Sequence, residues 1–426
     1  MTMAADKQDK VLNFSSEREQ SGTCSSSAER ENDQGKIFLN VPNLRFPGFT
    51  GEWRKDRIRN LFTINVGGDI DKKEVSDIQS AKYPYPVIAN ALTNDGIYGY
   101  TSGYKDDAPN ITVTGRGDVG CAKYRNYPLY PIVRLLVLHS NGNIDCRFGE
   151  HAINRIKKYE ESTGVPQLTA PQLGAYSICY PCLNEQSKIG DFLCLLEERI
   201  ITQIRIIAQL QSLMTGLNNY LMDNPSWEKV WVGDFMDFYS TNSLSWEQLD
   251  YNQGEVKNLH YGLIHSGLPT LIDCRTSALP NIKNEFLPKQ YTLCEDGDVA
   301  FADASEDTNE VGKAVEICDC TEQSVVCGLH TIHGRDKANV TIVGFKGFAF
   351  NAKYFHDQLR RISQGSKIYS ISTDNVKSCY LRIPSKSEQK QVVHLLSAYL
   401  QKIDIAEQEL KAYQVQKQYL LKAMFV

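Results

Sequence analysis

The sequence lacks the features by which secreted and membrane proteins are usually recognised. Its first residues, Met1 to Asp9, are polar and contain no apolar run of the signal-peptide kind. No stretch reaches the roughly 18 apolar residues that a membrane span needs. The richest window, 192–221, is interrupted by Glu197, Glu198 and Arg199. We therefore expect a cytoplasmic protein with no membrane partner.

The chain also lacks an excess of positive charge. It has 46 Lys and Arg against 51 Asp and Glu among 426 residues, which gives a net charge of −5. This excludes a protein that coats nucleic acid through bulk charge, but not one that uses local patches. The 12 cysteines fit reduced, buried thiols, since Cys179-x-x-Cys182 has no second Cys or His pair nearby to complete a zinc site. We expect no metal site.

Motifs for catalysis are missing as well. No Gly-x-x-x-x-Gly-Lys-Ser/Thr loop is present to hold ATP phosphates. Asp307, Glu310 and Lys313 imitate the carboxylates and lysine of a nuclease metal site, but a solvated acidic loop explains them better. His330 and His333 flank a strand-like run with no evident Asp or Cys partner. The sequence therefore predicts a chain that is not an enzyme and holds no cofactor.

What the sequence does contain is an internal repeat of a long helix. Pro181 falls on Pro384, and Glu185-Gln186 on Glu388-Gln389, when 203 is added to each number. Both copies carry apolar residues at alternating spacings of three and four, the pattern of a coiled coil. Two unrelated amphipathic helices are the alternative, but they would not share a constant offset. The residues that we expect to pair the helices are Leu193, Leu196, Ile200 and Ile207 in the first copy, and Leu396, Tyr399, Ile403 and Leu410 in the second.

Polar and proline residues define the register and the starts of these helices. Gln203 and Lys417 are the single polar breaks in the two apolar seams, where a polar side chain can fix register. Pro181 and Pro384 cannot lie inside a helix, so each marks a boundary. Ser385 or Ser387 is expected to cap the second helix.

A weaker repeat precedes each long helix. Trp53-Arg-Lys55 matches Trp227-Glu-Lys229 at an offset of 174, and short β-branched and aromatic runs typical of strands follow both. The predicted strands include 85–90, 111–114, 132–138, 298–302 and 340–343, and helical stretches are expected at 151–161 and 354–363.

The chain is thus expected to have an α+β organisation in five parts. A loosely attached leader (1–36) precedes two α/β domains (37–178 and 225–380), which alternate with two long helices (179–224 and 381–426). The helices are expected to pair as an antiparallel coiled coil with pseudo-twofold symmetry. A helix from 186 to 222 would span about 55 Å.

Several segments, in this order, resemble the specificity subunits of type I restriction–modification systems. They are Leu44–Trp53, Ile111–Gly120, Asp298–Asp307 and the chain end Leu420–Phe425, together with the two Pro-x-x-x-Glu-Gln helix starts. The resemblance covers roughly residues 38–426, although Cys179-Tyr-Pro-Cys182 departs from the family's pattern.

This resemblance implies a non-catalytic subunit that recognises double-stranded DNA. Each α/β domain would be a target-recognition domain that reads one part of a split site, and the helices would space the two domains. The helices would also dock two modification (methyltransferase) subunits, which restriction (motor and nuclease) subunits join. S-adenosylmethionine, ATP and Mg²⁺ would then belong to those partner subunits.

Local charge indicates where DNA contacts are expected. Residues 340–382 hold seven basic and two acidic side chains, and residues 103–158 hold nine basic and five acidic ones. Lysine and arginine contact phosphates, and arginine also reads base edges. An ordinary solvated charge is an equally good explanation for any single one. The candidates are Arg116, Lys123, Arg125 and Arg134 in the first domain, and Lys346, Lys353, Arg360, Arg361 and Lys367 in the second.

Two other classes of function stay open from the sequence. One is a coiled-coil scaffold with two ligand- or protein-binding heads and no DNA role. The other is an enzyme in its own right, which the missing motifs disfavour.

Overall fold

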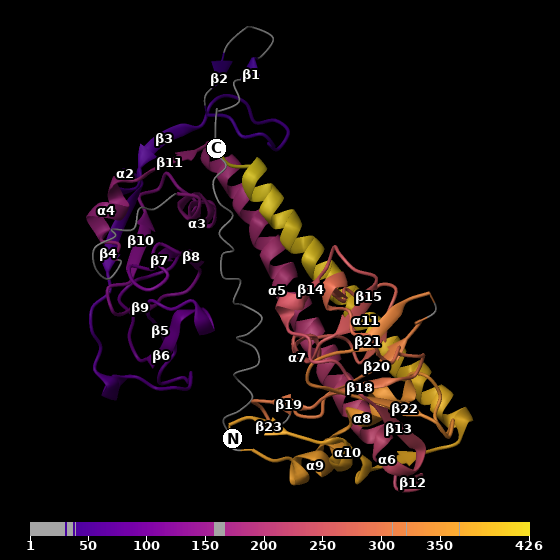
Figure 1. The fold of residues 1–426 in the computed structure, drawn as a ribbon. Coiled ribbons are helices and arrows are strands. Elements are labelled where there is room, and N and C mark those ends of the chain that lie inside the picture. Colours follow the sequence, from indigo (N-terminus) through magenta and orange to yellow (C-terminus); the bar gives the residue numbers. More distant parts are fainter. Residues whose placement is uncertain are drawn as a thin grey trace. The chain divides into compact units, whose positions relative to one another are not determined.

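Two long helices, α5 (Leu183–Met222) and α11 (Lys386–Ala423), are the longest elements of the chain. A computed structural model describes residues 30–31, 37–38, 40–156, 167–308, 310–320, 322–365 and 367–426. The chain forms two units, unit 1 (Met1–Thr202 with Leu410–Val426) and unit 2 (Gln203–Glu409). Each long helix therefore contributes one part to each unit (Figure 1).

The predicted leader lies almost wholly outside the described residues. Only its strand β1 (Arg30–Glu31) is described, and it pairs antiparallel with β2 (Ile37–Phe38).

The two long helices pack against each other in an antiparallel sense, as predicted. In unit 1 the Lys417 Nζ lies 2.6 Å from a carboxylate oxygen of Glu197. In unit 2 the Gln203 Nε2 donates to the Ala406 carbonyl and to the Glu409 carboxylate, both at 3.0 Å. Residue numbers therefore rise along α5 as they fall along α11. Both polar breaks of the seam have a partner on the facing helix, which disfavours other registers.

The starts of the long helices are fixed by side chains. Ser385 caps α11, since its hydroxyl accepts from the Glu388 N–H at 3.4 Å and donates to the Glu388 carboxylate at 2.7 Å. At the start of α5, the buried Glu185 carboxylate pairs with Arg45 at 2.6 Å. A negative charge in the first turn is favoured by the helix dipole.

Unit 1 is built on an antiparallel four-stranded sheet in the order β4-β10-β7-β8. A three-stranded sheet β6-β5-β9 and a pair β11-β3 complete its strands. The bounds are β3 (Arg54–Arg57), β4 (Phe62–Val66), β5 (Tyr85–Ile88), β6 (Ile97–Thr101), β7 (Asn110–Val113), β8 (Ala122–Arg125), β9 (Tyr130–Pro131), β10 (Leu136–Ser140) and β11 (Ser177–Tyr180). The helices are α2 (Ile58–Leu61), α3 (Cys146–Asn154) and α4 (Ala170–Ala175), with short 3₁₀ turns η1 (Lys72–Glu74) and η2 (Thr93–Gly96).

The core of unit 1 joins this sheet to the long helices. Trp53, Phe148 and Phe425 are buried and contact one another, and the Phe148 and Phe425 rings stack at 5.1 Å. Leu193 of α5 and Leu420 of α11 belong to the same cluster. The chain end is therefore part of the first core rather than a free tail.

Unit 2 is built on a five-stranded sheet in the order β13-β22-β18-β20-β16, with a second sheet β14-β17-β15-β21 and the pairs β12-β24 and β19-β23. The strands are β12 (Glu228–Trp231), β13 (Met236–Tyr239), β14 (Leu249–Asp250), β15 (Val256–Leu259), β16 (Leu271–Asp273), β17 (Asn281–Ile282), β18 (Val299–Ala302), β19 (Ala304–Ser305), β20 (Ala314–Cys318), β21 (Ser324–Cys327), β22 (Thr331–Asp336), β23 (Tyr369–Ser370) and β24 (Tyr380–Ile383). The helices are α6 (Val232–Phe235), α7 (Tyr261–His265), α8 (Phe345–Phe350), α9 (Lys353–Ile362) and α10 (Thr373–Lys377), with 3₁₀ turns η3 (Trp246–Gln248) and η4 (Asn284–Phe286).

The repeat seen in the sequence extends to matching elements of the two units. At the offset of 174, β3 falls on β12 and α2 falls on α6. At the offset of 203, β11 falls on β24, and the capping boxes Thr169–Gln172 and Ser372–Asn375 occupy equivalent positions.

Some sequence predictions were wrong in detail. Residues 340–343 form no strand, because the Ile342 N–H donates to the Gln389 side chain and the Val340 carbonyl accepts from it. The predicted strand 132–138 is broken by left-handed backbone at Val133 and Arg134, so β10 begins only at Leu136. The predicted helix 151–161 is α3, which ends at Asn154, and residues 157–166 lie outside the described residues.

Candidate nucleic-acid interface

The structure places the predicted helix-pairing residues in two apolar clusters. In unit 1, Leu193, Leu196 and Ile200 join the cluster that contains Leu420. In unit 2, Leu396, Tyr399 and Ile403 join the cluster that contains Met214. Ile207 is buried and Leu410 is half-buried.

Arg125 is the first candidate for DNA contact that the structure moves into the protein interior. Its side chain is 5% exposed. The guanidinium forms an ion pair with Asp95 and donates to the Thr112 hydroxyl at 3.2 Å and the Tyr127 hydroxyl at 2.8 Å. Because its donors are used internally, the prediction that Arg125 contacts DNA is not supported, and its role is to hold β7, β8 and the Asp95 turn together.

Arg116 and Arg134, by contrast, lie on loops that the structure brings together. The Asn90 side chain accepts from the Gly115 N–H at 2.7 Å and donates to the Val133 carbonyl. A Cβ added at Gly115 would lie 3.0 Å from the Arg134 carbonyl oxygen, so the close approach needs glycine.

The backbone around this pair of loops is unusual. Val133 and Arg134 have φ values of 53° and 61°, a region that non-glycine residues avoid. Arg134 is exposed and Arg116 is half-buried. Strained backbone of this kind is often retained at binding loops. The sequence pointed to both arginines but not to Asn90, whose side chain holds the two loops together through their backbone.

Lys123 lies beside this group on β8. It is 55% exposed and forms an ion pair with Asp95, the carboxylate that also binds Arg125. It remains accessible at the surface, but part of its charge is neutralised within unit 1.

Lys346 is the second candidate that the structure moves into the interior. Its Nζ lies 3.2 Å from the Glu316 carboxylate and 2.8 Å from the Thr341 hydroxyl, and both charged side chains are almost fully buried. Burial raises the pKa of Glu316 despite the opposing effect of Lys346. Lys346 is therefore a core residue that compensates Glu316, and the prediction of a DNA contact is not supported.

The remaining candidates for DNA contact in unit 2 lie on α9 and in the loop after it. Lys353 and Arg360 both pair with Asp357, whose pKa is lowered, mainly by the hydrogen bond from Lys353. Arg361 and Lys367 are exposed, at the end of α9 and in the loop that follows. Surface pairs of this type hold their side chains loosely, so they can exchange a carboxylate for a phosphate.

Glu310 and Lys313 of the acidic sequence motif lie between β19 and β20. Lys313 pairs with Glu310 at 3.0 Å, and both side chains are half-buried. Within the described part of the chain, the only groups of three or more potential metal ligands are Cys294/Cys327/His333 and Glu150/His151/Glu197. Neither includes Asp307, Glu310 or the Cys179/Cys182 pair.

His333 was misjudged from the sequence. It was expected to lack an Asp or Cys partner, but its Nε2 lies 2.7 Å from an Asp298 oxygen and it neighbours Cys327. Likewise the Nδ1 of His330 lies 3.1 Å from the Asp303 carboxylate. These partners lie at the two ends of β18 and at the end of β21, so spacing along the chain could not reveal them.

Among the described residues, no helix is both long enough and apolar enough to cross a membrane.

Comparison with known proteins gives consistent matches. The family model of the type I restriction modification DNA specificity domain matches residues 50–212 and 278–412. A Mycoplasma pneumoniae protein named as type I specificity subunit S.MpnORF507P is 31% identical over 130 residues, which is 30% of this chain and 35% of the relative. A second, S.MpnORF89P, is 30% identical over 130 residues, 38% of its length. The chain thus matches little more than a third of the length of these two relatives.

Solved structures match the fold over most of the chain. The S subunit of a type I restriction–modification system from M. genitalium aligns with a TM-score of 0.62 at 16% identity, covering 91% of this chain and 99% of that one. A chain from a study of complex assembly and conformational transition of the type I R-M system aligns with a TM-score of 0.54 at 14% identity, covering 90% and 98%. With the family model matching most of the sequence in two segments, one for each copy of the repeat, the chain belongs to the type I restriction modification DNA specificity family.

Proposed function

We propose that this chain is the sequence-reading, non-catalytic subunit of a type I restriction–modification complex, and that it recognises a bipartite site in double-stranded DNA. Unit 1 reads one half-site and unit 2 reads the other. The paired helices α5 and α11 set the gap between them. The observation that carries the proposal is a duplicated framework that bears two dissimilar sets of surface loops.

The charge distribution supports a DNA-reading role. The chain is acidic overall, yet Arg116 and Arg134 share one loop cluster in unit 1, and Arg361 and Lys367 are both exposed at the end of α9 and in the loop after it in unit 2. Phosphate contacts by such residues position a protein, and arginine can donate two hydrogen bonds to guanine. A scaffold without a DNA role would not need these residues at the loops.

We assign the chemistry of the complex to partner subunits. Two modification subunits would dock on α5 and α11 with bound S-adenosylmethionine, and restriction subunits would bring ATP and Mg²⁺. This chain would contribute recognition and spacing, and needs no cofactor for either.

The first experiment maps methylated adenines in cells that express this chain with the modification subunit. We expect a split motif with a fixed gap. Matched heptad insertions in both α5 and α11 lengthen each helix by about 10 Å, or roughly three base pairs of duplex. The gap should change and both half-sites should stay. A continuous motif, or a gap that is unchanged in a folded insertion variant, contradicts the proposal.

The second experiment tests the two loop clusters by DNA binding of the assembled complex. Arg116→Ala with Arg134→Ala should weaken binding at least tenfold, and Arg361→Ala with Lys367→Ala should do so independently. Each lost phosphate contact should reduce the dependence of log K on log salt by nearly one. Lys229→Ala on β12 is the control, since it alters an exposed lysine outside both clusters. Equal losses in the control would show that only general charge matters.

A further inference from the structure

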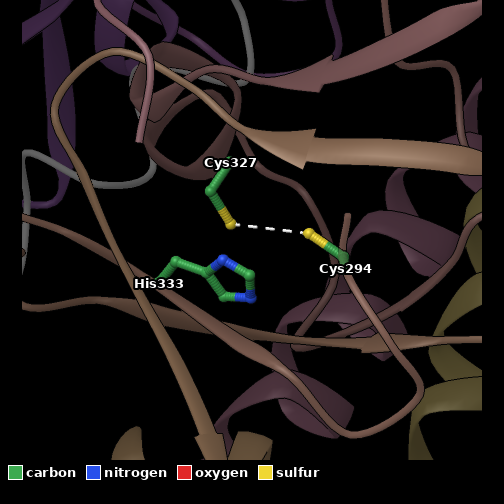
Figure 2. A group of neighbouring side chains, drawn as sticks. All are labelled: Cys294, Cys327 and His333. Carbon is green, nitrogen blue, oxygen red and sulfur yellow. Dashed lines mark hydrogen bonds between the residues drawn. The ribbon is translucent and has the colours of Figure 1, made fainter. Parts of the chain in front are cut away.

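Three side chains in unit 2 converge in a way that DNA recognition does not require. They are Cys294, Cys327 and His333, which are 5%, 3% and 1% exposed. One ligand atom from each lies within 4.8 Å of the other two, and the two sulfurs are 3.7 Å apart. Figure 2 shows the sulfurs pointing toward each other, with the Nδ1 side of the imidazole turned toward them.

The strands of unit 2 hold the three residues in place. Cys327 ends β21, and His333 lies on β22 opposite Ala300 of β18. Cys294 precedes β18 and its N–H donates to the Val325 carbonyl of β21 at 2.8 Å. All three positions are therefore set by backbone pairing, which is the rigidity that a metal site needs.

The imidazole has one ring nitrogen engaged and one without a partner. Nε2 lies 2.7 Å from Asp298 Oδ2, and Arg335 holds both oxygens of that carboxylate at 2.8 and 2.7 Å. Nδ1 is buried and has no hydrogen-bond partner in the structure. When Nε2–H donates to the carboxylate, the lone pair of Nδ1 is directed at the sulfurs, as in the carboxylate–histidine–metal arrangement.

The spacing of the sulfurs matches a tetrahedral zinc site. With Zn–S bonds of about 2.3 Å, two sulfurs on one zinc ion are about 3.8 Å apart, close to the observed 3.7 Å. A covalent S–S bond is about 2.0 Å long. The residue types agree, since two thiolates and an imidazole are ligands that zinc takes in proteins.

The local charges also balance with a divalent ion. Two thiolates neutralise Zn²⁺, and Arg335 neutralises Asp298. Charges buried this deeply persist only when they are paired. Cys327, unlike Cys294, also lines a cavity of about 690 Å³ bordered by Tyr239, Asn242 and Tyr291, so an ion and a water molecule can approach the cluster from the side of Cys327.

We propose that Cys294, Cys327 and His333 bind a zinc ion through two Sγ atoms and one Nδ1, with water from the adjacent cavity as the fourth ligand. The ion links β21, β22 and the segment before β18, and so stabilises unit 2. This departs from the expectation of no metal site drawn from the sequence. It is independent of the proposed function in DNA recognition.

The chain contains a matched control for this site. Cys274 and Cys320 also lie in the core of unit 2, with their sulfurs 3.4 Å apart. This second pair belongs to none of the groups of potential metal ligands found in the described residues. Two close thiols without a histidine should not retain zinc at stoichiometric level.

The test uses the full chain, purified under reducing conditions without chelator. Inductively coupled plasma mass spectrometry should find about one zinc per chain. Replacement by Co²⁺ should give thiolate charge-transfer bands and the intense visible bands of tetrahedral cobalt. Both measurements need only the natural sequence, so they do not depend on whether a variant folds.

Variants then assign the ligands. Cys294→Ser and His333→Gln should each lower zinc content at least fivefold, whereas Cys274→Ser with Cys320→Ser should retain it. Absence of zinc in the natural chain, copper in its place, a Cys294–Cys327 disulfide in peptide mass spectra of metal-free protein, or equal zinc in His333→Gln would each overturn the proposal.

Discussion

The two units anchor their long helices with the same side chain but differ in the strand order of their sheets. Gln186 and Gln389, both fully buried, stand at equivalent positions of the repeat. Gln186 accepts from the Asp145 N–H and donates to the carbonyls of Asn143 and Pro181. Gln389 makes the matching three bonds, to Ile342, Val340 and Pro384. The comparison teaches that the connection between sheet and helix is kept while the sheets themselves are free to vary.

The variation reaches the centre of the sheets. Val137 of β10 lies opposite Asn65, and His333 of β22 lies opposite Tyr239. Asn65 and Tyr239 are 174 residues apart, the offset of the repeat, so Val137 and His333 are equivalent. The apolar core position of unit 1 thus corresponds to the histidine of the Cys294/Cys327/His333 cluster in unit 2.

A second difference follows the aromatic residues that face the repeated tryptophans. Phe148 packs near Trp53, and Phe345 packs near Trp227. The next residue is Gly149 in unit 1, where an added Cβ would lie 2.9 Å from a side-chain carbon of the core. In unit 2 the next residue is Lys346, which forms a buried ion pair with Glu316. The same place in the core is therefore filled by close apolar packing in unit 1 and by an ion pair in unit 2.

The largest effect should come from breaking that ion pair. Lys346→Met leaves the Glu316 carboxylate buried without a cation, which should cost about 3–5 kcal/mol of stability. Urea unfolding monitored by hydrogen exchange should show the loss in unit 2 alone. Adding Glu316→Gln to Lys346→Met should restore most of it. If the double variant is as unstable as the single one, the pair is not the cause.

The next largest effect should show whether Gln186 and Gln389 contribute equally to the stability of their units. Gln186→Met and Gln389→Met each remove three buried hydrogen bonds at nearly constant volume, at a cost of about 2–3 kcal/mol. The two losses should agree within about 1 kcal/mol and appear in different units. Gln209→Met, which alters an exposed glutamine of α5, is the control and should change stability by less than about 0.5 kcal/mol. A large loss for only one anchor would show that the copies no longer rely on it equally.

A smaller effect depends on pH and belongs to unit 1. Burial, with repulsion from Glu197, raises the pKa of Glu150 to about 7. Burial lowers the pKa of His151 to about 4. Between about pH 4.5 and 7 the folded chain keeps a proton on Glu150 that the unfolded chain has lost, so this group lowers stability as pH rises. His151 acts in the opposite direction between about pH 4 and 6.5, because only the unfolded chain binds its proton there.

Glu150→Gln separates the two contributions. The variant keeps an oxygen to accept from the Tyr124 N–H but cannot ionise. Its stability relative to the natural chain should rise from near zero at pH 4.5 to about 1–3 kcal/mol above pH 7. Denaturant midpoints at several pH values give this difference, and Glu198→Gln on the exposed face of α5 should give none. A difference that does not vary with pH would assign the effect to packing.

The smallest effects should come from exposed ion pairs in the two units. Lys123 and Lys353 are 55% and 68% exposed. Replacing either with alanine should change the free energy of unfolding by less than about 0.5 kcal/mol. Thermal unfolding checks this and shows whether losses of DNA binding in such variants come from recognition. A larger loss would make these lysines structural.

The elements that could be predicted from the sequence are those with local or repeated signals. The seams of α5 and α11, the cap at Ser385 and the helix at 354–363 follow from periodicity and end residues, and all appear in the structure. The repeat at an offset of 203 is found by comparing the two helix segments of the sequence directly. These predictions succeed because the interactions that start and stabilise a helix lie close together in the sequence.

The misses have a common cause in partners that lie far away along the chain. The sequence predicts surface positions for Arg125 and Lys346, but both are buried. Arg125 pairs with Asp95 and Lys346 with Glu316, each about 30 residues earlier in the chain. The β-branched run 340–343 was predicted to be a strand, but the Gln389 side chain forms hydrogen bonds with its backbone in place of a neighbouring strand. Composition and periodicity cannot show which distant side chain will compete for a group.

Gln203 and Ala406 meet in the helix pair although they are counterparts in the duplication, 203 positions apart. Duplicated segments normally diverge separately, because a substitution in one copy does not alter the surroundings of the same site in the other. Gln203 and Ala406, by contrast, contact each other, so a substitution at one of them alters the surroundings of the other. Evolution at this point of the chain is therefore coupled: one copy can hold the amide only while the other offers a small residue and a carbonyl oxygen that can accept a second hydrogen bond.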